Sequence, residues 1–233
     1  MGRVSPNPPV GAVLVYNDRI LGEGYHTAYG APHAEVEAIR SVHDDEKHLI
    51  PDSILFVSLE PCCITGKTPP CTDLILHEGI RNVRYSATDP NPAIAGRSKT
   101  LLEQKGIHVI SGILEEEGLE LIKPFRINIT EQRPYIILKW AQSKYGFMGK
   151  TDERVLLSHA YTNAWTHQQR ASVDAIMVGA RTVMTDDPFL TTRDAPGSSP
   201  VRVVFDYNAN LTMQYNAFND DGRRIFYFSL KEN

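Results

Sequence analysis

The first half of the chain is organised around the sequence His33-Ala34-Glu35, read together with Pro61-Cys62 and Cys71. One imidazole and two thiols are ligands that zinc prefers, and a catalytic zinc site leaves its fourth tetrahedral position to water. Bound zinc lowers the pKa of that water to about 7. Glu35 is a carboxylate suited to move protons between this water and a leaving group. We therefore predict that His33, Cys62 and Cys71 bind zinc and that Glu35 is catalytic.

Each of these residues also has an ordinary structural interpretation. A histidine or glutamate at a helix start is commonly a cap or a partner of the helix dipole, and a single cysteine is commonly a small buried hydrophobe. A structural zinc would need a fourth protein ligand. Cys63 is available, but we expect it not to bind the ion that its neighbour Cys62 binds, because the backbone would be strained.

Length and composition indicate an ordinary globular protein. The chain has 233 residues, of which 42% are hydrophobic and 22% are charged. At roughly 100–200 residues per domain, this length predicts one or two domains. The net charge of −4 argues against a nucleic-acid partner, because phosphate backbones bind basic surfaces.

The sequence also predicts a location. No apolar run reaches the roughly 18 residues of a membrane span, and the first residues lack the apolar core of a signal peptide. The three cysteines form no disulfide framework. Because zinc thiolates must stay reduced, we expect a cytoplasmic protein without a membrane partner.

Strands alternate with helices along the whole chain, which predicts an α/β fold with helices on both faces of a sheet. In the first half we expect strands at 12–16, 20–25, 53–59, 82–87 and 107–110. Helices are expected from Pro32, at 71–78, at 99–105 and at 114–128. His33 and Glu35 then lie on a first helical turn.

A second α/β unit follows a boundary near residues 130–134. Its expected strands are 135–140, 175–179 and 201–205, with 225–228 last and a helix at 161–171; 135–140 and 175–179 are apolar enough to be buried. We predict domains 1–130 and 131–233, the second truncated, since the chain stops just after a strand. No Rossmann or P-loop motif follows a strand.

Several segments resemble one family, the bifunctional riboflavin-biosynthesis deaminase/reductases. In the first half these are Pro6-Asn7-Pro8, His33-Ala34-Glu35, Leu59-Glu60-Pro61-Cys62, Gly66-Lys67-Thr68-Pro69-Pro70-Cys71 and Asp89-Pro90-Asn91-Pro92. In the second half they are the segments 138–143, 174–179 and 186–193.

The resemblance implies a cytidine-deaminase-like three-layer sandwich followed by a partial dihydrofolate-reductase-like α/β domain. It implies a hydrolase that removes ammonia from a phosphoribosylamino-diaminopyrimidine, and an NADPH-dependent reductase of the ribosyl group. The expected cofactors are Zn²⁺ and NADPH, the partner is this small molecule, and a homo-oligomer is left open. The implied substrate-binding residues are Asn7, His26, Lys67, Asp89, Asn91, Arg170, Leu190 and Arg193. The implied cofactor-binding residues are Ala141, Thr182 and Asp186.

Some positions depart from the family pattern. The family usually has histidine at Ile64, aspartate at Tyr145, tryptophan at Leu156 and serine at Arg154. Its loop for the cofactor phosphate lies beyond the last residue here. Two other interpretations therefore stay open: a deaminase for another nucleobase or nucleoside, and a zinc-stabilised remnant without activity.

Overall fold

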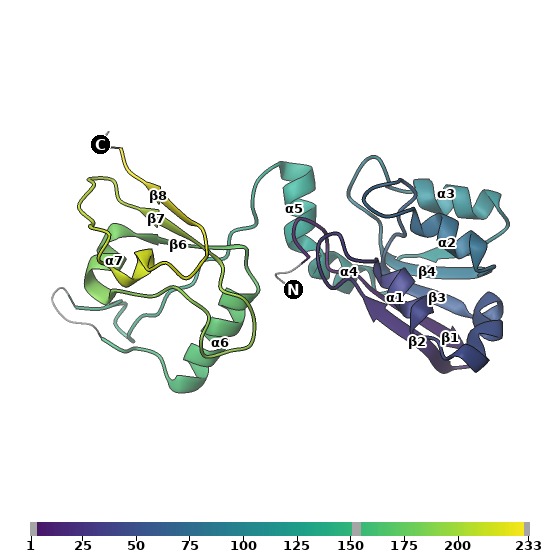
Figure 1. Cartoon of the computed structure of the whole chain (residues 1–233), viewed down its shortest axis with the longest axis horizontal. Coiled ribbons are helices and arrows are strands. Elements are labelled where there is room, and N and C mark those ends of the chain that lie inside the picture. The colour runs from purple at the N-terminus through teal and green to yellow at the C-terminus, as the bar shows by residue number, and fades with distance from the viewer. Residues whose placement is uncertain (1–3, 151–154, 231–233) are drawn as a thin grey trace. The chain divides into compact units, whose positions relative to one another are not determined.

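The computed structural model describes residues 4–150 and 155–230 (Figure 1). The chain folds into two compact units, one ending at Ile136 and the other beginning at Ile137. The boundary predicted after residue 130 lies a few residues earlier and stays a prediction. Within the described residues, no helix has the length and apolarity to span a membrane.

The first unit is built on a five-stranded mixed sheet. Its strands are β1 (Gly11–Tyr16), β2 (Arg19–Tyr25), β3 (Ile54–Leu59), β4 (Asn82–Ala87) and β5 (His108–Ser111), in the order β2-β1-β3-β4-β5. β1 runs antiparallel to β2 and β3, whereas β3, β4 and β5 are parallel. Asn17 and Asp18 both have positive φ in the tight turn between β1 and β2, a conformation typical of a two-residue hairpin.

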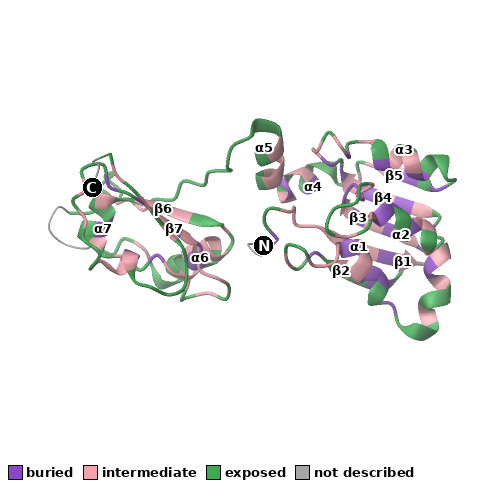
Figure 2. Ribbon diagram, turned by 45° about the horizontal axis from the view of Figure 1, so that its top comes forward, coloured by how far each residue is buried: buried purple, intermediate pink, exposed green. Residues whose placement is uncertain are grey.

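Helices pack on this sheet. α1 (Ala34–Arg40), α2 (Cys71–His77) and α3 (Arg97–Gln104) contribute to one buried cluster with the sheet, while a 3-10 helix, η1 (Asp44–Asp52), leads into β3. α4 (Glu115–Leu121) packs on β4 through a second, smaller cluster that includes Leu59, Ala87 and Ile122. Figure 2 shows the buried residues concentrated along the strands.

Two helix predictions need correction. The single helix expected at 114–128 is two helices, α4 and α5 (Lys123–Glu131), because Pro124 has no N–H for an interior helical hydrogen bond and takes a first-turn position instead. The helix expected to open at Pro32 begins at Ala34 with His33 as its N-cap. Glu35 keeps its predicted place in the first turn.

The topology brings distant segments to one edge of the sheet. The carboxyl ends of parallel strands meet at the same edge, which is where open α/β sheets commonly bind ligands. Glu60, Pro61 and Cys62 directly follow β3, and Asp89 lies just beyond β4. The sheet therefore places the zinc-binding segment beside the loop after β4.

The second unit has a three-stranded parallel sheet. Its elements are α6 (Ala160–Ala171), β6 (Ala175–Gly179), α7 (Ala180–Asp186), β7 (Val201–Phe205), the 3-10 helix η2 (Asn216–Phe218) and β8 (Ile225–Phe228), with sheet order β6-β7-β8. Val183, Leu190, Val204 and Ala217 are its buried core.

Two strand predictions in this unit were wrong, at least in part. No strand forms at 135–140, and Leu138 is 78% exposed, because this segment has no hydrogen-bonded partner strand in the described structure. The segment 175–179 is a strand but is not buried. Met177 is 59% exposed because alternate residues of β6 point away from the core, so apolar content did not indicate burial.

Candidate active site

The predicted zinc ligands come together from three separate segments. His33 caps α1, Cys62 follows β3, and Cys71 is the first residue of α2. His33 Nδ1 lies 3.5 Å from Cys62 Sγ and 3.3 Å from Cys71 Sγ. All three ligand atoms lie within 4.8 Å of one another.

These distances fit a tetrahedral zinc ion. Zinc sits about 2.3 Å from sulfur and about 2.0 Å from nitrogen, which places nitrogen and sulfur about 3.5 Å apart across the ion. His33 Nε2 lies 3.2 Å from the Thr68 hydroxyl, which can accept its proton and so leave Nδ1 free to bind. Three protein ligands leave a fourth position for water, which is the pattern of a catalytic site.

The thiols and the imidazole share protons in the absence of metal. A hydrogen bond from the Cys71 thiol lowers the pKa of Cys62 to about 4, and the same bond raises the pKa of Cys71. The interaction with Cys62 raises the pKa of His33. Zinc binding displaces protons from such ligands, so the metal affinity of this site falls as pH falls.

Glu35 lies beside the ligands, in the interior. Its side chain is buried, and this burial raises the pKa of the carboxyl. Ionisable groups that exchange protons during catalysis commonly have pKa values shifted toward neutral pH by burial. Glu35 therefore has the position and the environment of a proton carrier.

A cavity of about 500 Å³ opens onto this centre. Its lining includes His33, Glu35 and Cys62 together with all five residues predicted to bind the first substrate: Asn7, His26, Lys67, Asp89 and Asn91. Phe125 and Ile129, from α5, add apolar walls. A volume of this size is typical of pockets for small organic molecules. The roles of the five polar residues stay predictions.

His26 is oriented by two hydrogen bonds. Its Nδ1 donates to the Pro32 carbonyl at 3.0 Å, because a carbonyl oxygen can only accept. Its Nε2 is then the acceptor for the Asn7 side-chain amide at 3.1 Å. Asn7 itself also lines the cavity. This network links the turn at residues 5–8 to the segment that leads into α1.

Lys67 lies at an exposed part of the cavity lining, with its ammonium 4.0 Å from the centre of the Tyr29 ring. A cation over an aromatic face is held by the ring quadrupole. Ile64 is 41% exposed and lines the same cavity. An apolar side chain therefore stands where the family usually has histidine.

The sequence did not reveal a role for Glu60. This buried carboxylate accepts hydrogen bonds from the backbone N–H groups of Asp89, Gly96 and Ser98, at 3.0 to 3.3 Å. It therefore anchors the loop that carries Asp89 and Asn91. Asp89 in turn accepts from the Asn91 N–H at 2.8 Å. Glu60 lies next to the Pro-Cys dipeptide, but its hydrogen-bond donors are 29 to 38 positions away in the sequence, so no local pattern could predict them. Thr68 and Tyr29 were missed for the same reason.

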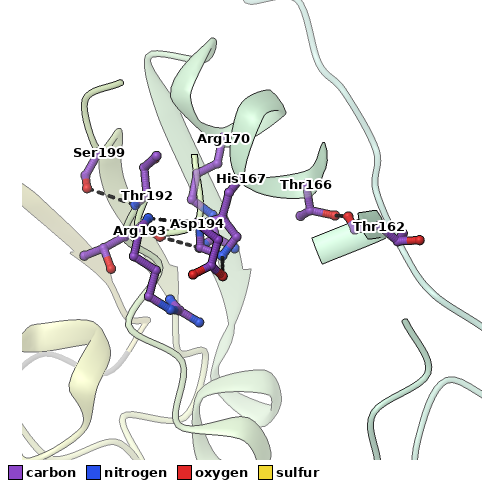
Figure 3. Close-up of polar contacts among 9 residues, drawn as sticks. Thr162, Thr166, His167, Arg170, Thr192, Arg193, Asp194 and Ser199 are labelled. Atoms are coloured by element: carbon purple, nitrogen blue, oxygen red, sulfur yellow. Dashed lines mark hydrogen bonds and ion pairs between the residues drawn. The ribbon is translucent and has the colours of Figure 1, made fainter. Parts of the chain in front are cut away.

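The predicted residues of the second unit form two groups. Arg170 lies on α6, and Leu190 and Arg193 lie in the loop after α7. Figure 3 shows Arg170 and Arg193, and Arg170 donates to the Thr191 carbonyl at 2.6 Å. Leu190 packs its side chain in the core, so only its backbone is available to a ligand.

The other group is the predicted cofactor site. Thr182 and Asp186 lie one turn apart on one side of α7, and Ala141 is half-buried outside regular structure. A hydroxyl and a carboxylate can bond a ribose hydroxyl or a carboxamide, whereas the carboxylate disfavours phosphate. The side-chain chemistry of Thr182 and Asp186 is compatible with the nicotinamide end of NADPH, and the roles of all three residues stay predictions. Arg154 lies outside the described residues, and Leu156 is exposed.

Comparison with known proteins identifies both units. Residues 2–87 match the family model of the cytidine and deoxycytidylate deaminase zinc-binding region, and residues 134–232 match that of the RibD C-terminal domain. The chain thus combines a zinc-dependent, cytidine-deaminase-like domain with a dihydrofolate-reductase-like one. This pairing, with the relatives below, makes the chain similar along its length to the RibD family of riboflavin biosynthesis proteins.

The similarity extends over the whole chain. The chain is 38% identical to the riboflavin biosynthesis protein RibD of Aquifex aeolicus, over 100% of this chain and 65% of that protein. It is 34% identical to RibD of Escherichia coli, over 95% of this chain and 63% of the relative. The chain therefore spans a little less than two thirds of these curated relatives.

A solved structure from Thermotoga maritima, described as a diaminohydroxyphosphoribosylaminopyrimidine deaminase/5-amino-6-(5-phosphoribosylamino)uracil reductase, is similar with a TM-score of 0.90. Its identity to this chain is 39%, and the match covers 100% of this chain and 66% of that one. Acinetobacter baumannii RibD is similar with a TM-score of 0.86 at 29% identity, over 99% of this chain and 65% of the other.

Proposed function

We propose that the first unit removes an amino group hydrolytically from a phosphoribosylamino-diaminopyrimidine in riboflavin biosynthesis, and that the second unit reduces its ribosyl group with NADPH. The observation that carries the first step is the His33, Cys62 and Cys71 cluster beside buried Glu35, on a cavity of about 500 Å³. The similarity of the chain to RibD proteins, in both of its units, supports both steps.

The residues of the chain have distinct tasks in the proposed deamination. His33, Cys62 and Cys71 hold zinc, which supplies an activated water at neutral pH. Glu35 takes a proton from the incoming water and returns it to the departing ammonia. The Asn7 amide and the loop bearing Asp89 and Asn91 provide polar groups that orient a pyrimidine ring.

The negative charge of the proposed substrate also matches a positive charge on the cavity lining. Lys67 supplies a cation at the exposed part of the cavity, suited to a sugar phosphate. In the second unit, Arg170 and Arg193 would bind the same phosphate during reduction, while Ala141, Thr182 and Asp186 would hold the nicotinamide end of NADPH. Since the zinc thiolates need reducing conditions, we place the enzyme in the cytoplasm.

The decisive experiment combines metal analysis with the variant Glu35→Gln. Protein prepared without chelators should contain about one zinc per chain. Glu35→Gln should keep the zinc but lower ammonia release by roughly 100-fold or more, because only the proton carrier is removed. Glu37→Gln is the matched control, since Glu37 lies on the same helix but pairs with Arg40 at the surface. Normal deamination by Glu35→Gln would refute the mechanism.

The substrate is tested separately. Ammonia release should be measured with the phosphoribosylamino-diaminopyrimidine and with cytidine, deoxycytidylate and adenosine. We expect turnover of the first compound only. Turnover restricted to the nucleosides or the nucleotide would instead assign the chain to another deamination, in keeping with Ile64 at the cavity.

A further inference from the structure

His167 is a buried histidine for which the proposed reaction has no role so far. It lies on α6 with 4% of its surface exposed. Its Nδ1 lies 3.1 Å from the backbone nitrogen of Arg193 and 3.4 Å from that of Asp194. Its Nε2 lies 3.2 Å from the Asp194 carboxylate. Figure 3 shows the ring beside this segment.

These contacts determine where the proton of His167 resides. A backbone N–H can only donate, so Nδ1 must be an unprotonated acceptor. The single proton of the neutral ring is then on Nε2, where it is donated to the Asp194 carboxylate. Burial lowers the pKa of His167, and the charge of Arg170 lowers it further, with a smaller contribution from Arg193 and an opposing one from Asp194. His167 therefore binds two consecutive residues of one loop: Nδ1 accepts from the N–H groups of Arg193 and Asp194, and Nε2 donates to the Asp194 carboxylate.

The loop held in this way carries a cation. Arg193 is exposed, and no carboxylate among the described residues forms an ion pair with its guanidinium. Nearby Arg170 is held by the Thr191 carbonyl, and its buried Nε has no hydrogen-bond partner. Burial lowers the pKa of Arg170, and the charge of Arg193 lowers it further, so the two cations repel each other. An anionic ligand would relieve this repulsion and supply an acceptor.

We propose that His167 is a positioning residue that fixes the backbone at Arg193, so that the Arg170 and Arg193 cations are held ready for the phosphate of the second unit's substrate. This inference rests on the proposed function of that unit. His167 touches no reacting atom, and its contribution is to reduce the freedom that Arg193 would lose on binding.

The test uses ribose 5-phosphate as the probe and the full chain with zinc. Calorimetric titration should give an affinity on the order of 10-fold weaker for His167→Gln, whose amide reaches toward Asp194 but provides no acceptor near Nδ1. His167→Asn should bind nearly as well as the unaltered protein, because its side-chain oxygen can replace the Nδ1 acceptor. Rescue by asparagine but not by glutamine is an outcome that a merely space-filling role would not produce.

The control is His159→Asn. His159 also accepts a backbone N–H through Nδ1, at the start of the same helix, but it is exposed, and within residues 4–150 and 155–230 it forms no hydrogen bond or ion pair with Arg170 or Arg193. His159→Asn should leave the affinity for ribose 5-phosphate unchanged. Deamination by the first unit, measured on every variant, verifies that each protein is intact outside the second unit.

The results distinguish the role of His167 from the proposed function of the second unit. Equal affinity of the unaltered protein, His167→Gln and His167→Asn would overturn the role of His167 and leave the proposed function standing. Failure of the unaltered protein to bind ribose 5-phosphate would overturn the proposed substrate site and this inference with it. Nitrogen-15 spectra should also show His167 protonated on Nε2 near neutral pH, and the opposite tautomer would contradict the hydrogen bonds described.

Discussion

Burial raises the pKa of the Asp89 carboxyl to about 6, and the nearby charges of Glu60 and Cys62 add to this shift. The opposing effect is the hydrogen bond from the Asn91 N–H. At neutral pH the fold therefore holds an ionised carboxylate in an unfavourable environment. Groups kept in this way at a cavity wall are commonly used to bind ligands, and Asp89 lines the proposed substrate cavity.

The cost of burying this ionised carboxylate predicts how Asp89→Asn changes the free energy of unfolding with pH. The folded pKa is above the unfolded value of 3.8, so ionised Asp89 destabilises the fold above about pH 6 and not below about pH 3.8. Asp89→Asn should increase the free energy of unfolding at pH 8 by on the order of 1–3 kcal/mol, with the gain fading as the pH falls through 6 toward 4.

Urea unfolding at a series of pH values measures this effect. The same variant should lose affinity for the pyrimidine substrate, so stability and binding should move in opposite directions. A gain in stability that is equal at pH 8 and pH 4 would show that the carboxyl charge is not its cause.

At the scale of elements, the position of α1 depends on two glycines of β2. A Cβ atom added at Gly24 would lie 2.4 Å from the Ala38 backbone nitrogen, and one added at Gly22 would lie 2.3 Å from the Ala38 carbonyl oxygen. Only glycine permits this close approach of helix to strand. Because His33 and Glu35 are at the start of α1, this packing also sets the position of the zinc ligand and the proton carrier.

We expect Gly24→Ala to destabilise the first unit and to impair deamination more than stability alone explains. Overpacking against backbone atoms costs about 1–3 kcal/mol, and moving α1 by even a fraction of an ångström would misplace His33 and Glu35. Thermal unfolding, zinc content and ammonia release should be measured together at a temperature where the variant is folded.

Gly11→Ala is the matched control for this prediction. Gly11 lies on the adjacent strand β1, where the nearest atom to an added Cβ is 4.0 Å away, an ordinary contact. It should be nearly neutral for stability. If Gly24→Ala retained full activity and stability, the close packing of α1 on β2 would not control the site.

At the scale of the whole molecule, zinc should stabilise one unit without the other. All three ligands belong to the first unit, while both tryptophans, Trp140 and Trp165, belong to the second. A ligand that binds only the folded state adds about 4 kcal/mol when its concentration is about 1,000 times its dissociation constant. Removing zinc should therefore remove this stabilisation free energy from the first unit alone.

A chelator should therefore lower one thermal transition selectively. We expect the transition seen by circular dichroism to shift to lower temperature, while tryptophan fluorescence reports an unchanged midpoint for the second unit. Cys62→Ser should reproduce the effect without a chelator. A chelator that moved neither signal would show that folding of the first unit does not involve bound metal.

Much of this organisation could be predicted from the sequence. Residue types and their order indicated the His33, Cys62 and Cys71 ligands, and turn and helix signals placed all five strands of the first unit to within a few residues. These features depend on side-chain chemistry and on neighbours along the chain. The substrate and cofactor residues were inferred from family resemblance, and their roles stay predictions.

Other features were decided only by the tertiary structure. Glu60 anchors a loop that begins 29 positions later, and His167 holds residues 26 and 27 positions away. The apolar segment 135–140 forms no strand, and β6 is exposed on one side, although both looked buried. The physical reason is that hydrogen-bond pairing and burial depend on which distant atoms come close. Periodicity and composition, in contrast, report only on local neighbours.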